Sequence, residues 1–402
     1  GVVHVPIVED KLGIKLFGAQ IKSDGFVYNT TLEEDVGGDD VQNYGFAAKW
    51  QPTEQFDIKL HYEKTKDESD QGAYVNQNVG TDNTCVFFNS CVTNTTDNEN
   101  QNSSNTRNFS DNEYDTTILT ANYDFGNMVL TYIGAQRDMD EQNMQSFDAS
   151  PADFLDMNYF NEWDQESHEL RLTTNFDGPL NFVAGLYSFE VDYTQYWDVY
   201  HLHWTYNAIL GFPLFPDVTA PTSAKTQGQR QQTDSAAAFI SADWAINDRW
   251  TLTLGGRYTE EEKDFSGDNG SIGYNPAAGE PRPTGHATWD KFAKWPEFTP
   301  SGSLRFQVSD DLMLWASYSE GFKSGGFFGR QANFNDIDVT FDPKYVENME
   351  IGFKSSLLDG AMTLNAAYFS NDYTDKQESV LVPRGPADVA TIVRNAATEE
   401  IS

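Results

Sequence analysis

Strand-like segments in which apolar and polar residues alternate recur along the whole chain, and this pattern restricts the fold more than any other feature of the sequence. The segment Leu312–Arg330 shows it most clearly. Its first half would place Leu312, Leu314, Ala316 and Tyr318 on one face and Met313, Trp315, Ser317 and Ser319 on the other. An alternation with a period of two is the signature of a β-strand whose two faces meet different surroundings. The sequence therefore predicts an all-β fold.

About fourteen such strands are expected, each near or above the roughly 9–11 residues that cross a bilayer with tilt. We assign them to Leu12–Lys22, Val41–Gln51, Glu54–Lys66, Glu113–Asp124, Asn127–Met139, Glu162–Phe176, Leu180–Trp197, Arg230–Ile246, Arg249–Phe265, Glu297–Val308, Leu312–Phe327, Pro343–Leu357, Ala361–Glu378 and Val389–Asn395. A short strand remnant, Gly1–Val5, precedes them.

The gaps between these strands are short and long in turn. The short gaps carry the Gly, Asn, Asp or Pro of hairpin turns: Pro52-Thr53, Phe125-Gly126, Asp177–Pro179, Asn247-Asp248, Ser309–Asp311 and Leu358–Gly360. The long gaps are Asp24–Asp40, Asp67–Asn112, Asp140–Asn161, Asp198–Gln229, Ser266–Pro296, Phe328–Asp342 and Ser379–Asp388. Short turns at one rim and long loops at the other predict an antiparallel up-and-down transmembrane β-barrel. A soluble β-sandwich has no reason to keep this parity.

The charged residues of the strands indicate which face points inward. Alternation places Arg257, Glu350 and Lys354, and likewise Glu169 and Arg171, on the face opposite the apolar one. A charge that faces lipid at mid-depth costs roughly 2–4 kcal/mol, so we expect these residues inside the barrel. Aromatic residues near strand ends suit girdles at the two membrane interfaces, and we assign that role to Trp50, Trp163, Tyr187, Trp250, Trp315 and Tyr373.

The charge balance excludes one class of partner. The 402-residue chain has 62 acidic and 26 basic residues and a formal net charge of −36. Nucleic-acid binding needs a basic surface, so we expect no nucleic-acid partner.

No stretch reaches the ~18 consecutive apolar residues of a membrane helix. Two cysteines, Cys85 and Cys91, lie in a polar gap, and we interpret them as a short disulfide, with free thiols as the alternative.

Several blocks of the sequence resemble the barrel domain of TonB-dependent outer-membrane receptors. The resemblance rests on SAAAFISADWAINDRWTLTLGGRYTEEEKDF (Ser235–Phe265), TPSGSLRFQVSDDLMLWASYSEGFKSGGF (Thr299–Phe327), DPKYVENMEIGFKSSLLDGAMTLNAAYFSNDYTDKQ (Asp342–Gln377), VRNAATEEIS (Val393–Ser402) and SHELRLTTNFDGPLNFVAGLYSFEVD (Ser167–Asp192). It implies a complete barrel of 22 strands around a plug domain. Residues 1–402 would then be a partial barrel domain, an internal fragment without the TonB box, the plug and the last strands.

The resemblance also implies a function. Such receptors are transporters that import a scarce, bulky nutrient across the bacterial outer membrane, energised by the TonB–ExbB–ExbD complex acting on the plug. A ferric siderophore is the cargo that we expect, while cobalamin, haem, oligosaccharides and other metal chelates remain open. No intrinsic cofactor is implied, and lipopolysaccharide would surround the wall. We expect no enzyme, because His168 and Glu169 are strand neighbours that point to opposite faces and no nucleophile elbow is present.

Three stretches are candidates for contact with cargo, and the third is the gap Asp67–Asn112, which is rich in Asn, Thr, Asp and Gln and is also typical of a solvated surface. The first contains Trp197, Tyr200 and Trp204 together with His201 and His203, which would share a face if extended and could then ligate a metal. Two imidazoles without a third ligand are also typical of a solvated aromatic loop. The second is the end of the segment Leu312–Arg330, where Phe327, Phe328 and Arg330 follow two glycines and would face an anionic siderophore. A strand end shaped for the fold is the alternative.

Two other functions are compatible with the same strands. A passive channel would be a closed barrel of fourteen strands, in which Val389–Asn395 pairs directly with Leu12–Lys22. A surface adhesin or assembly component would use its acidic loops as a binding surface and would have no substrate path inside.

Overall fold

One large antiparallel sheet makes up most of the protein. The computed structural model describes residues 1–75, 99–151, 153–201, 224–268, 272–274, 289–329, 340–385, 388–396 and 398–401. Within these ranges, no helix has the length and apolar character needed to cross a membrane. The strands of the large sheet are, in spatial order, β1 (Val2–Val8), β2 (Leu12–Lys22), β5 (Asp40–Trp50), β6 (Phe56–Asp67), β8 (Phe109–Asp124), β9 (Met128–Ser146), β10 (Asp156–Thr174), β11 (Leu180–Tyr200), β12 (Ala224–Ala245), β13 (Trp250–Asp268), β15 (Trp289–Ser309), β16 (Leu312–Lys323), β19 (Lys344–Leu357), β20 (Met362–Thr374) and β23 (Glu399–Ile401).

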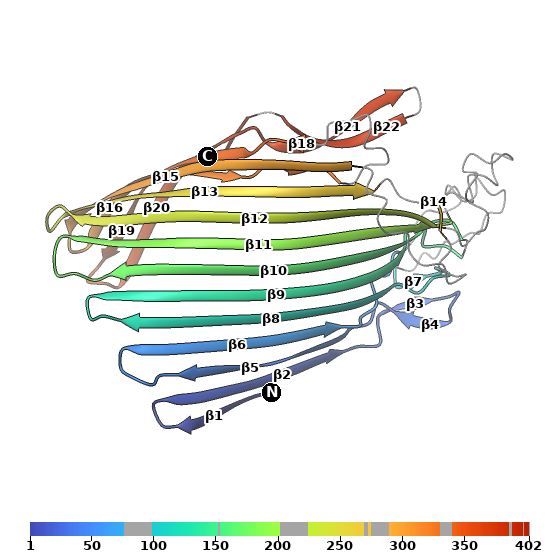
Figure 1. Ribbon diagram of the computed structural model, residues 1–402, viewed down its shortest axis with the longest axis horizontal. Helices are drawn as coiled ribbons and strands as arrows, with labels where there is room; N and C mark the ends of the chain where they lie inside the picture. Colours follow the sequence, from blue (N-terminus) through green and yellow to red (C-terminus); the bar gives the residue numbers. More distant parts are fainter. Residues whose placement is uncertain are drawn as a thin grey trace.

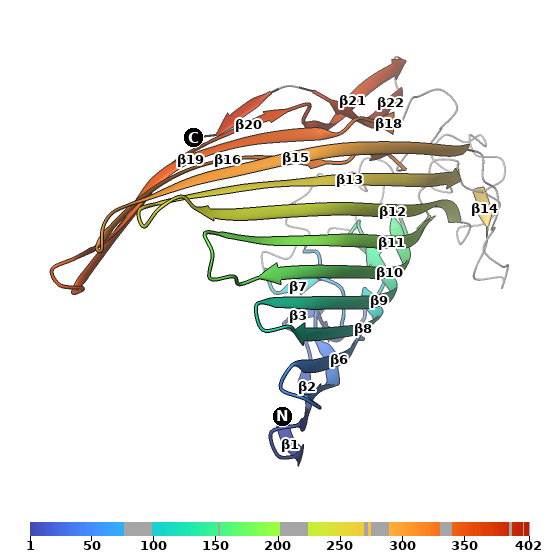
Figure 2. The ribbon, with the colours of Figure 1, turned by 60° about the vertical axis from the view of Figure 1, so that its left-hand side comes forward.

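Spatial order in this sheet follows chain order, and every neighbouring pair is antiparallel. The sheet is strongly curved, as the two views show (Figures 1 and 2). Its edges are β1 and β23, which do not pair with each other among the described residues. One end of the sheet carries tight turns, which we call the short-turn end, and the other carries the long connections, which we call the long-loop end (Figure 1).

Short accessory strands lie in the long connections. β3 (Val27–Asn29) pairs with β4 (Glu34–Val36) and with β7 (Gln101–Asn102), and β17 (Gly326–Phe327) pairs with β18 (Thr340–Phe341). β21 (Gln377–Gly385) pairs with β22 (Asp388–Asn395), and β14 (Ile272–Tyr274) adds to β12.

The predicted strands from Leu12 to Thr374 are confirmed, and the parity of short and long gaps is confirmed with them. Several strands run further toward the long-loop end than the sequence predicts. β9 continues to Ser146, β12 begins at Ala224 and β15 begins at Trp289. In the extensions of β9 and β12 both faces are largely polar, so the apolar alternation that marks a strand in the sequence is lost although the backbone ladder continues. The extension of β15 carries Phe292 on one face and Trp295 on the other, which also breaks the alternation.

The prediction that Val389–Asn395 is a wall strand is wrong. This stretch forms β22, which pairs with β21 in a separate hairpin, and the next wall strand beside β20 is β23. The chain leaves β20 at Thr374 and passes through Asp375, whose φ is 54°. A positive φ of this kind breaks an extended strand, which is why Ala361–Glu378 is not continuous. The closed barrel of a passive channel requires β22 to pair with β2. Among the described residues, these two strands do not pair.

The register of the sheet produces one apolar and one polar face. Directly opposed residues in antiparallel strands share a face. Leu252 opposes Leu304, and the row continues through Ala316, Ile351 and Tyr368 on successive strands. Ile351 and Tyr368 are 60% and 61% exposed. Most of the exposed large hydrophobic side chains on the strands between the two edges of the sheet lie on this same face. We infer that the apolar face is the outer, lipid-facing one.

The polar face carries the charges that the sequence places inside. Arg257 opposes Thr299, Glu350 opposes Ser317, and Lys354 opposes Met313. Glu169 forms an ion pair with Arg171 at 3.2 Å on the same face. The inward direction predicted for these five charged side chains is therefore confirmed, within the part of the chain that the structure describes.

The apolar band has a limited height. On β13 it runs from Trp250 to Tyr258, about nine residues, and gives way to Glu260 and Glu262 on the same face. About nine to eleven tilted residues span a bilayer core, so the band has the height of a membrane. Carboxylates of the neighbouring strands continue this acidic level above it, at Asp115, Asp138, Asp164, Asp192 and Asp234.

The predicted aromatic girdles are correct in part. Trp50 lies on the apolar face, where it is 47% exposed, and Trp250 stacks on Phe306 with ring centroids 4.2 Å apart. Trp163, Tyr187, Trp315 and Tyr373 instead point to the polar face. The sequence-based assignment of these four is therefore wrong, because position near a strand end does not determine which face a residue occupies.

Several of the inward aromatic rings lie over glycines of the neighbouring strand. A Cβ at Gly185 would be 2.5 Å from Phe239 Cζ, one at Gly352 would be 2.9 Å from the Trp315 ring, and one at Gly45 would be 2.7 Å from Phe17 Cζ. Aromatic cover of a glycine fills the space that its missing side chain leaves and fixes cross-strand register.

Substitution of Gly185 should destabilise the fold. We expect Gly185→Ala to lower the free energy of unfolding by roughly 1–3 kcal/mol, because the new methyl group collides with Phe239 and with the Leu170 carbonyl. Gly18→Ala is the control, since its Cβ would meet only ordinary contacts at 3.6 and 3.7 Å. Urea unfolding in phospholipid vesicles, followed by tryptophan fluorescence, measures both. Equal stability of the two variants would contradict the ring-over-glycine interpretation.

A charge on the apolar face should be costly. Leu254 is 57% exposed in the middle of the band, and Thr253 beside it points to the polar face. We expect Leu254→Arg to lower the free energy of unfolding in a bilayer by about 2–4 kcal/mol and Thr253→Arg to cost much less. The same unfolding measurement compares them, and a larger loss for Thr253→Arg would reverse our assignment of the two faces.

Candidate functional site

The polar face changes character toward the long-loop end, where amide and aromatic side chains replace small residues. One group of these side chains is joined by hydrogen bonds into an amide–tyrosine network, which comprises Tyr114, Glu141, Asn161, Tyr193, Gln195 and Gln229. Its members come from the five adjacent strands β8 to β12. Each occupies the polar-face parity of its strand, because Tyr114 opposes Met139 and Tyr193 opposes Trp163 on neighbouring strands.

Asn161 is the centre of the network. Its Nδ2 donates to Glu141 Oε2 at 2.9 Å, and its Oδ1 accepts from Tyr193 Oη at 3.2 Å and from Gln195 Nε2 at 2.8 Å. Tyr114 Oη donates to the other oxygen of Glu141 at 2.6 Å. Gln229 Nε2 donates to Gln195 Oε1 at 3.0 Å. The wall is therefore held in one arrangement over five strands.

This wall can bind a polar ligand through both donors and acceptors. Amide side chains and phenols present both kinds of group, and all six side chains are only half-buried, so they have unused capacity. The Trp163 ring meets the Tyr193 ring edge to face at 5.3 Å, which adds a flat apolar surface beside the amides. Glu141 is the one carboxylate in the network as we define it.

A second part of the site is the segment Ser324–Gly329, which we call the inward segment. Lys263 Nζ holds its start, because it donates to Ser324 Oγ at 2.7 Å and to the Gly325 carbonyl at 2.8 Å. Lys263 also pairs with Glu261 at 3.0 Å and lies 5.4 Å from the Trp295 ring centroid. These contacts occupy the ammonium group, so Lys263 serves to position the segment.

Phe327 anchors the inward segment in an aromatic cluster. It packs on Phe265 at 5.5 Å and on Trp295 at 6.2 Å between ring centroids, and all three are at most 8% exposed. Gly325 allows this approach, because a Cβ there would lie 2.5 Å from both Trp295 and the Phe341 carbonyl. The glycines that the sequence singles out are thus required by close packing.

The inward segment ends directly on the amide–tyrosine network. The Gly329 carbonyl accepts from Gln227 Nε2 at 3.5 Å, and a Cβ at Gly329 would overlap Gln229 Oε1 at 1.4 Å. The segment and the network therefore form one continuous surface on the polar face, although the contacting residues Gln227 and Gly329 are 102 residues apart in the sequence.

The structure brings some of the predicted site residues to this surface. Trp197 opposes Gln227 and shares the polar face with the network, and Phe328 is half-buried beside Gly329. Phe327 is buried as an anchor, and Tyr200 has the parity of the opposite face. Trp204, His203 and Arg330, like Cys85 and Cys91, lie outside the described residues.

His201 lies at the end of β11, next to a buried carboxylate. Its Nε2 is 3.6 Å from Asp156 Oδ2, which also accepts from Thr106 Oγ1 at 2.8 Å. Burial is the main cause that raises the pKa of Asp156 above its usual value. The described part of the chain contains no group of three or more His, Cys, Asp or Glu side chains that could hold a metal ion. A metal site at His201 and His203 therefore stays a prediction.

The sequence analysis missed the whole network. Its six residues were not singled out, because single amides and tyrosines in long polar stretches carry no motif: Tyr114, Glu141, Asn161, Tyr193, Gln195 and Gln229. A usable signal is the run at 227–232, where Gln227, Gln229 and Gln231 recur at the spacing of one strand face.

Comparison with known proteins gives a consistent result. The family model described as TonB dependent receptor-like, beta-barrel matches residues 49–402. The chain is similar to the ferric yersiniabactin uptake receptor FyuA from Yersinia pestis, with a TM-score of 0.73, 17% identity, and coverage of 99% of this chain and 54% of that one. It is also similar to the siderophore receptor PiuA from Acinetobacter baumannii (TM-score 0.67, 12% identity, 99% and 57% covered) and to the copper transporter OprC (0.63, 13%, 96% and 54%). The chain spans about half the length of these structures, and identities this low show the fold alone.

Loss of one network hydroxyl should weaken the wall measurably. We expect Tyr193→Phe to lower the free energy of unfolding by about 1 kcal/mol, because Asn161 Oδ1 then loses one of the two hydrogen bonds that it accepts. Tyr187→Phe is the matched control on the same strand and face, where the tyrosine ring contacts Arg257 at 5.2 Å through its face and not its hydroxyl. Urea unfolding compares the two, and a Tyr187→Phe loss as large as that of Tyr193→Phe would argue against the network.

Proposed function

The chain belongs to the TonB-dependent receptor β-barrel family, and we propose that it forms the wall of a receptor that actively imports a scarce, bulky nutrient across the bacterial outer membrane. Members of this family are transporters and not enzymes. The observation that carries the proposal is the continuous polar surface formed by the amide–tyrosine network and the inward segment. It lies at the long-loop end of a wall whose opposite face is apolar over the height of a membrane.

The cargo that we propose is a ferric siderophore. FyuA and PiuA are described as a ferric yersiniabactin uptake receptor and a siderophore receptor, which supports this class. OprC is described as a copper transporter, so the descriptions of all three proteins name a metal or a metal chelator as the cargo. Oxygen-rich chelates offer acceptors to the amide donors of Gln195 and Gln229 and a flat surface to Trp163. Trp197 and Phe328, which adjoin the network, would extend the contact.

The driving force that we propose is TonB coupling. A plug domain inside the complete barrel would bind TonB, and the ExbB–ExbD complex would supply energy from the inner membrane. The apolar band would lie against lipid, and the acidic level above it would lie among lipopolysaccharide headgroups. In this arrangement the barrel wall binds and guides the cargo, and the moving part is the plug.

Energy dependence tests this function. The complete receptor is expressed in a host whose own siderophore receptors are deleted, and uptake of iron-55 bound to a panel of siderophores is measured with and without an intact TonB protein. We expect uptake of at least one siderophore that disappears without TonB. Uptake that is equal in the two hosts would contradict active import and would indicate a passive channel.

A site variant separates cargo binding from expression. We expect Asn161→Leu to reduce uptake because Glu141, Tyr193 and Gln195 lose their common partner. Asn371→Leu is the control, since Asn371 bonds Asn348 at a distant pair of strands. Both proteins are first compared for the amount of folded barrel in the membrane. Unchanged uptake by folded Asn161→Leu would remove the network from the binding site.

A further inference from the structure

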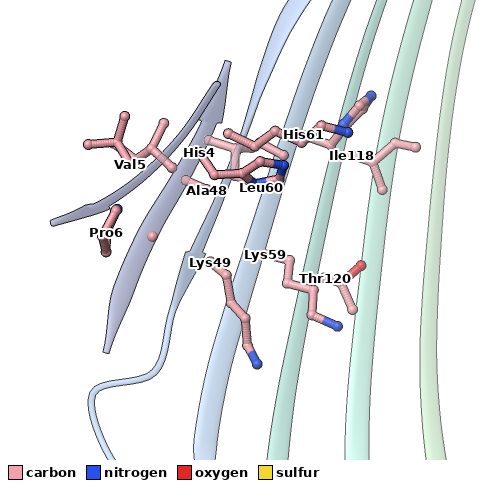
Figure 3. A pocket seen from close by; sticks show the side chains of 14 residues that line it. His4, Val5, Pro6, Ala48, Lys49, Lys59, Leu60, His61, Ile118 and Thr120 are labelled. Atoms are coloured by element: carbon pink, nitrogen blue, oxygen red, sulfur yellow. The ribbon is translucent and has the colours of Figure 1, made fainter. Parts of the chain in front are cut away.

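A second cluster on the polar face lies at the other end of the sheet, near the short turns of β1 to β8. Two rows of directly opposed residues cross the strands there. The upper row is His4, Lys15, Ala47, His61 and Ile118, and the lower row is Pro6, Gly13, Lys49, Lys59 and Thr120. These residues line a cavity of about 590 Å³, shown in Figure 3.

The lysines of this cavity form an arrangement that is unfavourable without a ligand. Lys49 and Lys59 are directly opposed, and like charges in opposed positions destabilise a sheet. Their side chains extend side by side in the same direction (Figure 3). Lys15 lies two residues further along β2 from Gly13, the residue opposed to Lys49, so three ammonium groups border one cavity.

The position of these three lysines separates them from the other lysines of the protein. Lys22, Lys64, Lys66, Lys263, Lys294 and Lys376 each have a carboxylate within 4 Å. Within the described ranges, Lys15, Lys49 and Lys59 have none, and neither do Lys11, Lys323, Lys344 and Lys354. Of these, only Lys15, Lys49 and Lys59 border one cavity, where an anion could contact all three ammonium groups.

The neighbouring side chains that the structure describes do not pair with the lysines of the lower row, which are therefore available to a ligand. Lys15 Nζ lies 5.2 Å from the Phe17 ring, which stacks on His61 at 5.7 Å. Glu63 is bonded to His61 Nε2 at 3.2 Å and to Asn43 Nδ2 at 2.8 Å, at the upper edge of the cluster. The carboxylate nearest in sequence to Lys59, Asp57, accepts from Asn122 at 3.2 Å and makes no ion pair with Lys59. Ile118 and the chain at Gly13 supply an apolar floor.

We propose that this cavity binds a multivalent oxyanion, and specifically the carboxylate groups of the imported cargo, on the side of the wall where the cargo leaves. Three ammonium groups with rotatable donors suit carboxylate oxygens, and two imidazoles add further donors. The cavity lies at the short-turn end, opposite the amide–tyrosine network, so a cargo that enters past the network meets the lysines later. This assignment of the ligand rests on the proposed import function.

Anion binding tests the proposal directly. The complete receptor is purified in detergent and titrated calorimetrically with citrate and, separately, with inorganic phosphate, at about 20 mM and about 300 mM NaCl. We expect citrate to bind more tightly than phosphate and to bind more weakly at the higher salt concentration. Absence of citrate binding overturns the site, and tighter binding of phosphate overturns the assignment to carboxylate cargo.

Three variants locate the binding in the cavity. We expect Lys49→Gln/Lys59→Gln to weaken citrate binding by about tenfold or more, because two charge-assisted contacts are lost. Lys49→Arg/Lys59→Arg keeps the charges and should bind citrate within about threefold of the wild type. Lys22→Gln, on β2 but paired with Asp40 outside the cavity, should leave binding unchanged. Folding of each variant is checked by its heat-dependent mobility in gels.

Each outcome decides between the site and the import function. A folded Lys49→Gln/Lys59→Gln protein that binds citrate like the wild type overturns the anion site. If wild-type uptake depends on TonB while citrate does not bind, the import function stands and the anion site alone falls. If citrate binds through the lysines while uptake is independent of TonB, the site stands and active import falls.

Discussion

The need to pair every backbone group while keeping two unlike faces apart is the constraint on which the structure depends. In hydrocarbon an unpaired N–H or C=O group costs several kcal/mol, so a spanning sheet needs an unbroken ladder. The ladder from β2 to β20 meets this need, because each wall strand pairs with the next in antiparallel register. A fixed register then places the row from Leu252 to Tyr368 on one face and Arg257, Glu350 and Lys354 on the other.

The polar face divides into two regions of different chemistry. Toward the long loops, neutral amides and phenols are joined into the amide–tyrosine network, with Glu141 as its carboxylate. Toward the short turns, Lys15, Lys49 and Lys59 border one cavity. The first region offers many weak directional contacts, and the second offers charge. A cargo that carries both chelating oxygens and carboxylates would meet groups suited to each part of it in turn.

The sequence predicts the wall of this protein well, because the wall depends on local alternation and on turn residues. It predicts that β16 begins after Ser309–Asp311 and that Trp315 lies on the face opposite Leu314, and both are confirmed, although the girdle role given to Trp315 is wrong. It does not predict that Phe327 turns back into the aromatic cluster, because that depends on Lys263 and Trp295, which are distant in the chain. For the same reason β22, with a strand-like sequence, was assigned to the wall. Pairing between distant polar side chains leaves no periodic signal, and so the network was missed.

The opposed lysines also bear on the register of the sheet. Directly opposed like charges cost up to about 1 kcal/mol. A shift of β5 by one residue against β6 would move Lys49 to the apolar face, where a lysine near the interface costs only about 0–1 kcal/mol. The same shift would turn the apolar side chains of β5, such as Phe46 and Trp50, to the polar face, and this loss opposes the shift. The apolar set of β5 therefore holds the native register against the repulsion of the two lysines, and binding of the proposed oxyanion would relieve that repulsion.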